Sequence, residues 1–212
     1  MAQEVLARDS DLEIRQLLAA YPELEPSVQL LLAKDESVSI RKALTKGGEA
    51  WSGSQLGEEV QLCLAKDRGT GMRLALAENH RLSSTAQVQL ASDLNTSVKM
   101  KLLEESGIMN PLSPQAQQIL AQDPSSGIRM GPVDKLFGFS PSASSEEIYL
   151  MLASDSDEKV RGRIIKHLVG PFSRGKCSDA VKARLLEGAE DGLREKLDEA
   201  ERAREMDSSA EE

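Results

Sequence analysis

The residue types that commonly do chemistry are sparse in this sequence and stand far from one another. The histidines are His80 and His167, and neither sits in a motif that sets a nucleophile against a base and an orienting group. The cysteines, Cys63 and Cys177, form no CxxC pair, so cysteine builds no zinc or iron–sulfur site. We therefore predict no catalytic residue, no metal site and no bound cofactor.

A glycine-containing turn is the nearest approach to a phosphate-binding motif. The stretch "DRGTGMR" holds Gly69 and Gly71 but lacks the preceding strand, the spacing and the lysine of a phosphate loop. Carboxylate pairs such as Glu58 and Glu59 do not stand out from ordinary surface charge. The sequence therefore indicates a protein that is not an enzyme.

Composition and charge exclude further classes. Among 212 residues, 40% are hydrophobic and only 3% aromatic, so aliphatic side chains must supply the core. The net charge is −9, and residues 187–212 hold eleven acidic and four basic residues, which leaves the body near −2. A near-neutral body lacks the basic footprint of duplex nucleic-acid binders, so a nucleic-acid partner is not expected. No apolar run is long enough to span a bilayer and no signal region opens the chain, so we predict a cytoplasmic protein.

The dominant feature of the sequence is an internal repeat. The template Q-x-x-L-A-x-D-x-x-x-x-[IVM]-[RK] occurs six times, with Tyr149 in place of Gln in the sixth copy, and "QVQLASDLNTSVK" is the fourth copy. The repeated acids and bases are Asp9, Asp35, Asp67, Asp93, Asp123 and Asp155 with Arg15, Arg41, Arg73, Lys99, Arg129 and Arg161. Successive aspartates are 26 to 32 residues apart, which is room for two short helices and their turns.

Each repeat is expected to form a helix pair. Leu and Ala at i+3 and i+4 from Gln share one face of the first helix, which Ser83 or Ser113 would cap. The repeated Asp is predicted to be the N-cap of the second helix, as Asp123 before Pro124 suggests. Pairs such as Ile40 with Leu44 then form the buried stripe of the second helix. Such short helices are stable only when successive repeats stack.

The repeated acids and bases allow two interpretations, and so do the repeated glutamines. The acid and base rows predict an ion-pair ladder within or between repeats, and the alternative is a row of free guanidinium groups facing an acidic ligand. The glutamines are expected to hydrogen-bond backbone between repeats, or else to line a concave binding surface. These glutamines are Gln3, Gln29, Gln61, Gln87 and Gln117.

The pattern "LAxDxxxx[IV]R" resembles the HEAT repeat, and the longer pattern from Leu64 through Asn79, Leu82 and Ser83 to Asp93 is similar to the leucine-rich repeat variant. The resemblance covers about residues 3–168. It implies an all-α fold, a right-handed α-α superhelix (solenoid) of about six to seven short helix-pair repeats. It also implies a scaffold role. The iron–sulfur cluster of some leucine-rich repeat variant proteins is not carried over, because this chain has no cysteine cluster.

The repeat is interrupted by longer connecting segments that hold most of the aromatic residues. Candidate partner-binding residues are Trp51, Phe137, Phe139 and Phe172. The alternative is that these aromatics fold back and fill gaps at the edge of the array. In the fifth repeat, Pro132 replaces the second buried aliphatic residue, so the helix after Ile128 is expected to end early or kink.

We therefore predict a solenoid over 1–186, a capping or tail helix over 187–206, and a disordered acidic tail over 207–212. The expected function is a non-enzymatic scaffold that binds a protein partner through the concave face and the aromatic inter-repeat loops. The alternative is a nucleic-acid-binding or DNA-glycosylase-like helical-repeat protein. The sequence leaves the oligomeric state open.

Overall fold

The structure, a computed structural model, describes residues 2–46, 56–107, 110–136, 143–169 and 179–187, together with Glu195, Glu199 and Arg202. Within these ranges the regular secondary structure is helical and no strand occurs. The prediction of an all-α fold is confirmed.

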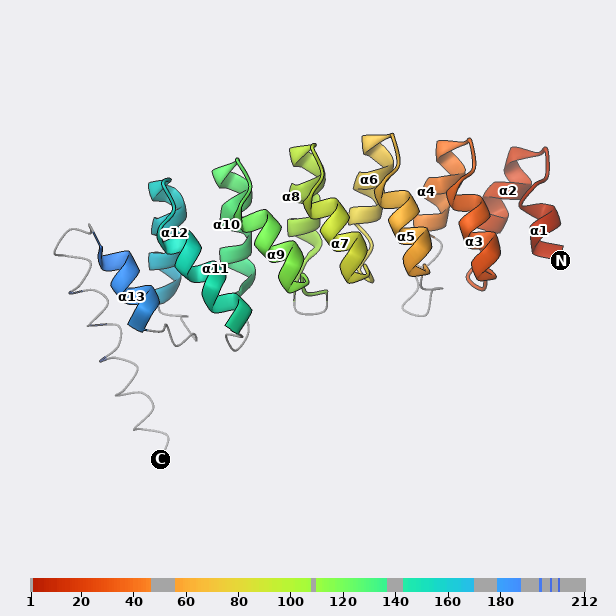
Figure 1. Cartoon of the computed structure of the whole chain (residues 1–212). Helices are drawn as coiled ribbons and strands as arrows, with labels where there is room; N and C mark the ends of the chain where they lie inside the picture. Colours follow the sequence, from red (N-terminus) through yellow and green to blue (C-terminus); the bar gives the residue numbers. More distant parts are fainter. Residues whose placement is uncertain are drawn as a thin grey trace, which may run out of the picture. The chain divides into compact units, whose positions relative to one another are not determined.

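Short helices follow one another along the chain, joined by tight turns or by longer segments (Figure 1). Their bounds are α1 Ala2–Leu6, α2 Leu12–Ala19, α3 Pro26–Ala33, α4 Val38–Lys46, α5 Glu58–Ala65, α6 Thr70–Ala77, α7 Ser84–Ala91, α8 Thr96–Glu105, α9 Pro114–Ala121, α10 Ser126–Leu136, α11 Ala143–Ala153, α12 Glu158–Val169 and α13 Asp179–Leu186. Each copy of the template spans the end of one helix and the beginning of the next.

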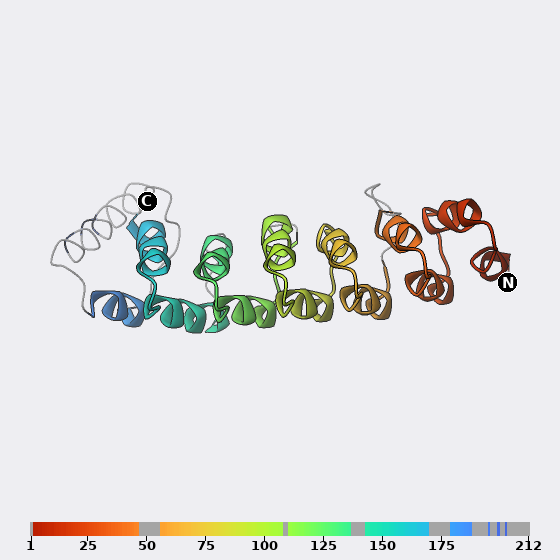
Figure 2. The same cartoon turned by 90° about the horizontal axis from the view of Figure 1, so that it is seen from above.

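The chain divides into two compact units, Met1–Ala116 and 117–212. In the first unit, α3, α5 and α7 pack side by side, and α2, α4, α6 and α8 do the same. Figure 2 shows these as two layers, with each odd-numbered helix also packed on the even-numbered helix that follows it. In the second unit, α11 packs on α12 and α13, and α10 packs on α12.

The core consists of the aliphatic positions of the template. In the first helices of the pairs, Leu32, Leu64 and Leu90 are fully buried, and in the second helices Ile40 and Val98 are too. Complete burial of one such side chain stabilises the fold by about 1.5–3 kcal/mol. Small alanines beside these leucines, buried as well, allow neighbouring helices to approach closely.

The first helices of the pairs begin as expected. Ser83 precedes α7, and its hydroxyl accepts a hydrogen bond from the amide of Ala86. Ser113 does the same for Ala116 at the start of α9. Pro26 occupies the first turn of α3, where the missing amide hydrogen costs nothing.

The prediction that the repeated Asp is the N-cap of the second helix is wrong by two residues. Asp11 caps α2 and Asn95 caps α8, each two positions after the repeated aspartate. The Oδ1 atom of Asp93 instead accepts a hydrogen bond from the amide of Asn95 at 2.8 Å. The same i to i+2 bond occurs at all six aspartates. The repeated residue therefore fixes the turn that leads to the cap.

The helix of the fifth repeat does not end early at its proline. α10 runs from Ser126 to Leu136 with Pro132 inside it, so the expectation of an early end is wrong, and the expected kink stays a prediction. Pro132 and Val133 are buried, and Val133 joins the core cluster of the second unit. Burial of the proline ring and of Val133 holds the helix together despite the missing amide hydrogen.

Replacing Pro132 with leucine is expected to raise the free energy of unfolding by about 1–3 kcal/mol. Leucine restores the amide donor inside α10 and removes the proline penalty of a helix interior, about 3 kcal/mol, less any misfit of the larger side chain. Urea denaturation would measure the gain. Pro26→Leu is the matched control, because proline is well tolerated in the first turn of α3. An equal gain at both positions would contradict this explanation.

Candidate functional site

The repeated acids and bases form ion pairs between successive helix pairs. We call each a rung: the arginine of one pair bound to the aspartate of the next. Nε donates to Oδ2 at 2.5–2.8 Å, and Nη2 is 2.8–3.5 Å from Oδ1. The rungs are Arg15–Asp35, Arg41–Asp67 and Arg73–Asp93 in the first unit and Arg129–Asp155 in the second. Their side chains are only 5–16% exposed.

The same arginine also binds the turn of its own repeat. Nη1 of Arg41 donates to the carbonyl oxygens of Asp35, at 2.6 Å, and Glu36, at 3.1 Å. The bond from Nη1 to the aspartate carbonyl six residues earlier recurs at all five template arginines. This bond explains why the base stands at a fixed spacing from the acid.

In three of the rungs, the hydrogen bond between the partners stabilises the charged form of the arginine. The hydrogen bond that Arg129 donates to Asp155 lowers the pKa of Asp155 and raises the pKa of Arg129. The hydrogen bonds that Arg15 and Arg73 donate to Asp35 and Asp93 likewise raise the pKa of both arginines. A paired, permanently charged guanidinium exchanges no proton near neutral pH, so the rungs do no acid–base chemistry.

The remaining template positions are placed as follows. Lys99 and Asp123 are buried, and each has an interaction partner. Arg161 donates to its own repeat's Asp155 carbonyl, and the carboxylate of Asp9 accepts only the amide of Asp11 among the described residues. The alternative of a row of free guanidinium groups is wrong for the four arginines of the rungs.

The repeated glutamines join the first helices of successive pairs. The side chain of Gln61, on α5, donates to the carbonyl oxygens of Leu56 and Arg81, at 2.8 and 3.0 Å. Its Oε1 accepts the amide of Ser83, the N-cap of α7, at 2.7 Å. We call this arrangement a glutamine clamp.

Three other glutamines make the same connection. Their Oε1 atoms accept the amide of the residue just before the next odd-numbered helix: Gln3 from Glu25, Gln29 from Gly57 and Gln87 from Ser113. Gln29, Gln61 and Gln87 are 1–4% exposed, so the alternative of a glutamine-lined binding surface is wrong for them. Gln117 is half-buried and is also engaged.

Several predicted residues lie outside the described ranges. These are Trp51, Phe137, Phe139, Phe172 and Cys177, and nearly all of 187–206 and 207–212. Cys63 is half-buried and donates to the carbonyl oxygen of Ala33, and His80 is exposed near Glu105. Among the residues that the structure places, no three His, Cys, Asp or Glu side chains gather to hold a metal ion.

Reasoning from the sequence missed an ion pair between α10 and α12. Arg163 of α12 binds both carboxylate oxygens of Asp134 on α10, at 2.6 and 2.7 Å, and this bond raises the pKa of Arg163. The residues are 29 positions apart, which is close to the repeat length. Neither residue belongs to the template, so only their separation could have indicated the contact.

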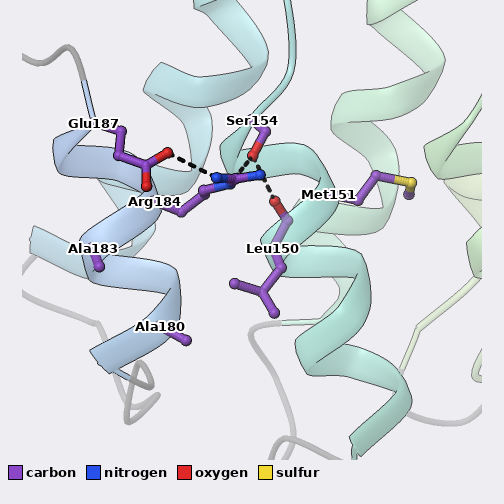
Figure 3. Close-up of a pocket in the computed structure, with 7 residues that line it drawn as sticks. All are labelled: Leu150, Met151, Ser154, Ala180, Ala183, Arg184 and Glu187. Carbon is purple, nitrogen blue, oxygen red and sulfur yellow. Dashed lines mark hydrogen bonds and ion pairs between the residues drawn. The ribbon is translucent and has the colours of Figure 1, made fainter.

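A shallow cleft lies between α11 and α13 in the second unit (Figure 3). Leu150, Met151 and the alanines of α13 form its apolar wall. At its edge Arg184 donates to Ser154 and to Glu187, both at 2.8 Å, as the dashed lines in Figure 3 show. Glu187 neutralises the arginine, so the cleft offers no unbalanced charge to a ligand.

Comparison with known proteins gives no further identification. No protein-family model, curated protein or solved structure matches this chain at a significant level. None of the helices that the structure describes is long and apolar enough to cross a bilayer. The geometry of the repeats therefore carries the functional argument.

The rung at Asp155 predicts a specific acid sensitivity. The pKa of Asp155 is lower in the folded chain than the ordinary value near 3.9, mainly because Arg129 donates to the carboxylate. Its stabilising contribution is complete above about pH 4 and is lost as the pH falls through the lowered pKa. Urea denaturation from pH 6 downward should show wild type more stable than Asp155→Asn, with the gap closing in acid.

Arg129→Gln is a second variant for the same series of pH values, because it removes the guanidinium that lowers the pKa of Asp155. It should reduce the acid dependence in the same way as Asp155→Asn. A gap between wild type and Asp155→Asn that stayed constant down to about pH 2 would contradict the proposed linkage.

Proposed function

We propose that this chain is a right-handed α-α superhelix of the HEAT-like or leucine-rich-repeat-variant kind, and that it is a non-enzymatic scaffold for a protein partner. The observation that carries the proposal is the rungs and glutamine clamps. In the four rungs and the glutamine clamps, these repeated polar side chains bind their own repeat or the next one. The repeated residues thus have a structural task, and recognition falls to positions that vary between repeats.

Stacked helix pairs provide a long surface with little chemistry of its own. In the first unit two layers of helices run side by side, so their outer faces present non-repeated side chains over several repeats. Solenoids bind extended partners on such a surface, usually on the concave side. We propose a protein partner for this face, in the cytoplasm.

The aromatic connecting segments are the proposed anchors. Trp51, Phe137, Phe139 and Phe172 follow second helices or precede first helices, where repeat proteins carry their insertions. Aromatic residues contribute most of the binding energy in many protein interfaces. A partner held by these residues would contact consecutive repeats along one edge.

Affinity capture with the full chain, followed by cross-linking mass spectrometry, tests the proposal. The expected result is a protein partner whose cross-links fall on the connecting segments, with at least about tenfold weaker binding after Trp51→Ala or Phe139→Ala. Trp51 is the only tryptophan, so its fluorescence reports contact directly. Leu94→Ala is the matched control, since Leu94 is an exposed large apolar residue outside those segments. Undiminished binding by both loop variants would refute the proposed anchors.

A further inference from the structure

Exposed apolar side chains concentrate on the first helix pair. Among the described residues, eight large hydrophobic side chains are exposed, and five of them lie between residues 5 and 21. They are Val5 at 71%, Leu6 at 41%, Leu12 at 44%, Leu17 at 75% and Tyr21 at 47%. In the first unit, α1 and α2 pack only on one another and on α3 and α4 (Figure 1). An apolar cluster of this kind marks a contact surface.

The internal repeat shows what these positions do elsewhere. Leu6 occupies the template leucine, which is fully buried at Leu32 and Leu64. Val5 corresponds to Cys63, whose thiol reaches the Ala33 carbonyl of the preceding helix pair. In the third repeat, this side of the first helix therefore contacts the pair before it.

The position of Leu17 has the same orientation. It stands two residues after the template arginine, as Arg163 does in the sixth repeat. Arg163 binds Asp134 of the preceding helix pair. Leu17 is thus an apolar residue at a site that faces a preceding pair.

Asp9 completes this surface. The template aspartates Asp35, Asp67, Asp93 and Asp155 each accept a guanidinium from the preceding pair. Asp9 is half-buried, and its carboxylate accepts the amide of Asp11 through Oδ1. Among the residues that the structure describes, Arg15 donates to the Asp9 carbonyl, but no guanidinium donates to the Asp9 carboxylate. We call Val5, Leu6, Asp9 and Leu17 the leading face.

We infer that the leading face is a docking surface for a helix of another polypeptide that carries an arginine between apolar residues. The chain itself displays the complementary chemistry: α4 presents Arg41 beside Ile40 and Leu44, and Arg41 binds Asp67 of the next pair. A partner helix with this pattern would cover Val5, Leu6 and Leu17, and its arginine would form an ion pair with the Asp9 carboxylate. Arginine fits better than lysine because the rung needs two parallel N–H donors.

A second copy of this chain is a poorer occupant. Two leading faces in contact would place two Asp9 carboxylates together with no base between them. Arg161 has no carboxylate partner among the described residues, and it lies on a pair whose first helix, α11, already packs on α13. α13 packs on α11 as α5 packs on α3, so α13 occupies the place that α1 of another copy would need. A partner of opposite charge is therefore favoured.

The test uses a helix pair of this chain as the probe. Residues 57–84 fused directly ahead of Met1 reproduce the spacing between the third and fourth repeats, so that Arg73 of the added pair reaches Asp9. We expect the Tm to rise by about 4 °C or more and amide exchange in residues 2–21 to slow about tenfold.

A double-mutant cycle isolates the rung. Asp9→Asn should lower the Tm of the fused protein by about 2–4 °C and that of the unfused chain by less than about 1 °C, and Leu17→Glu should abolish the gain in exchange protection. No rise in Tm, or an equal effect of Asp9→Asn in both proteins, would overturn the inference.

Sedimentation of the unfused chain tests whether a second copy of the chain binds the leading face. A monomer agrees with the inference, whereas a dimer that Leu17→Glu dissociates assigns the leading face to a second copy and overturns it. The leading face is separate from the aromatic segments. Failure of this test therefore leaves the scaffold proposal intact, and loss of the Trp51 and Phe139 site leaves the leading face intact.

Discussion

Replacing Arg41 with alanine is expected to lower the free energy of unfolding by about 3–5 kcal/mol, the cost of removing one partner of a buried ion pair. The substitution leaves the Asp67 carboxylate, 8% exposed, without its guanidinium. It also removes the donor that Asp35 and Glu36 share in the turn. Urea denaturation followed by far-UV circular dichroism measures the loss.

Two further variants show whether the buried charge causes that loss. Arg68 lies in the same turn as Asp67, but its side chain is exposed and bonds to no residue that the structure describes, so Arg68→Ala should change stability by less than about 0.5 kcal/mol. The double variant Arg41→Leu with Asp67→Asn should recover part of the stability, because no unpaired charge remains buried. If Arg68→Ala cost as much as Arg41→Ala, the rung would not be the source of the effect.

Replacing Gln61 with leucine is expected to lower the free energy of unfolding by about 2–4 kcal/mol. Leucine has a similar size but makes none of the three bonds of the glutamine clamp, so the Ser83 amide and the Leu56 carbonyl lose their partner away from water. Gln61 is 1% exposed, so water cannot replace the amide without rearrangement. The same denaturation experiment gives the value.

Gln89→Leu is the matched control for the clamp. Gln89 lies on α7, is half-buried, and makes no hydrogen bond to any residue that the structure places. Its replacement should change stability by about 0.5 kcal/mol or less. Equal losses at Gln61 and Gln89 would show that the effect comes from the helices and not from the clamp.

The helices and their buried faces could be predicted because they depend on local spacing. Leu at i+3 from Gln shares a helix face with Ala at i+4, and both Leu64 and Ala65 are buried as that spacing requires. Ser83 caps its helix for an equally local reason: its hydroxyl reaches an amide three residues on. Because the template recurs, each of these local predictions applied to the corresponding residues of the other repeats.

Predictions that depended on the exact end of a helix or on packing fared worse. The N-cap was placed at the repeated aspartate, whereas residues such as Asn95 hold that position, because a turn of two residues intervenes. The helix at Pro132 was expected to end early or kink, whereas α10 continues to Leu136 with Pro132 and Val133 buried. The first error lies in a turn within two residues of the aspartate, whereas the second concerns a buried position packed by side chains from elsewhere in the chain.

The sequence by itself determined that this chain is helical, that its repeats bury Leu, Ala and one β-branched or long aliphatic residue, and that acid, base and glutamine recur together. These follow from helical periodicity and from the internal repeat. Only the tertiary structure decided that Arg41 binds the aspartate of the next repeat while holding the carbonyls of its own, and that Val5 and Leu17 are exposed beside Asp9. The reason is physical: a side chain's bonding partners and its exposure depend on which helix stands beside it, and one repeat's residues do not specify that neighbour.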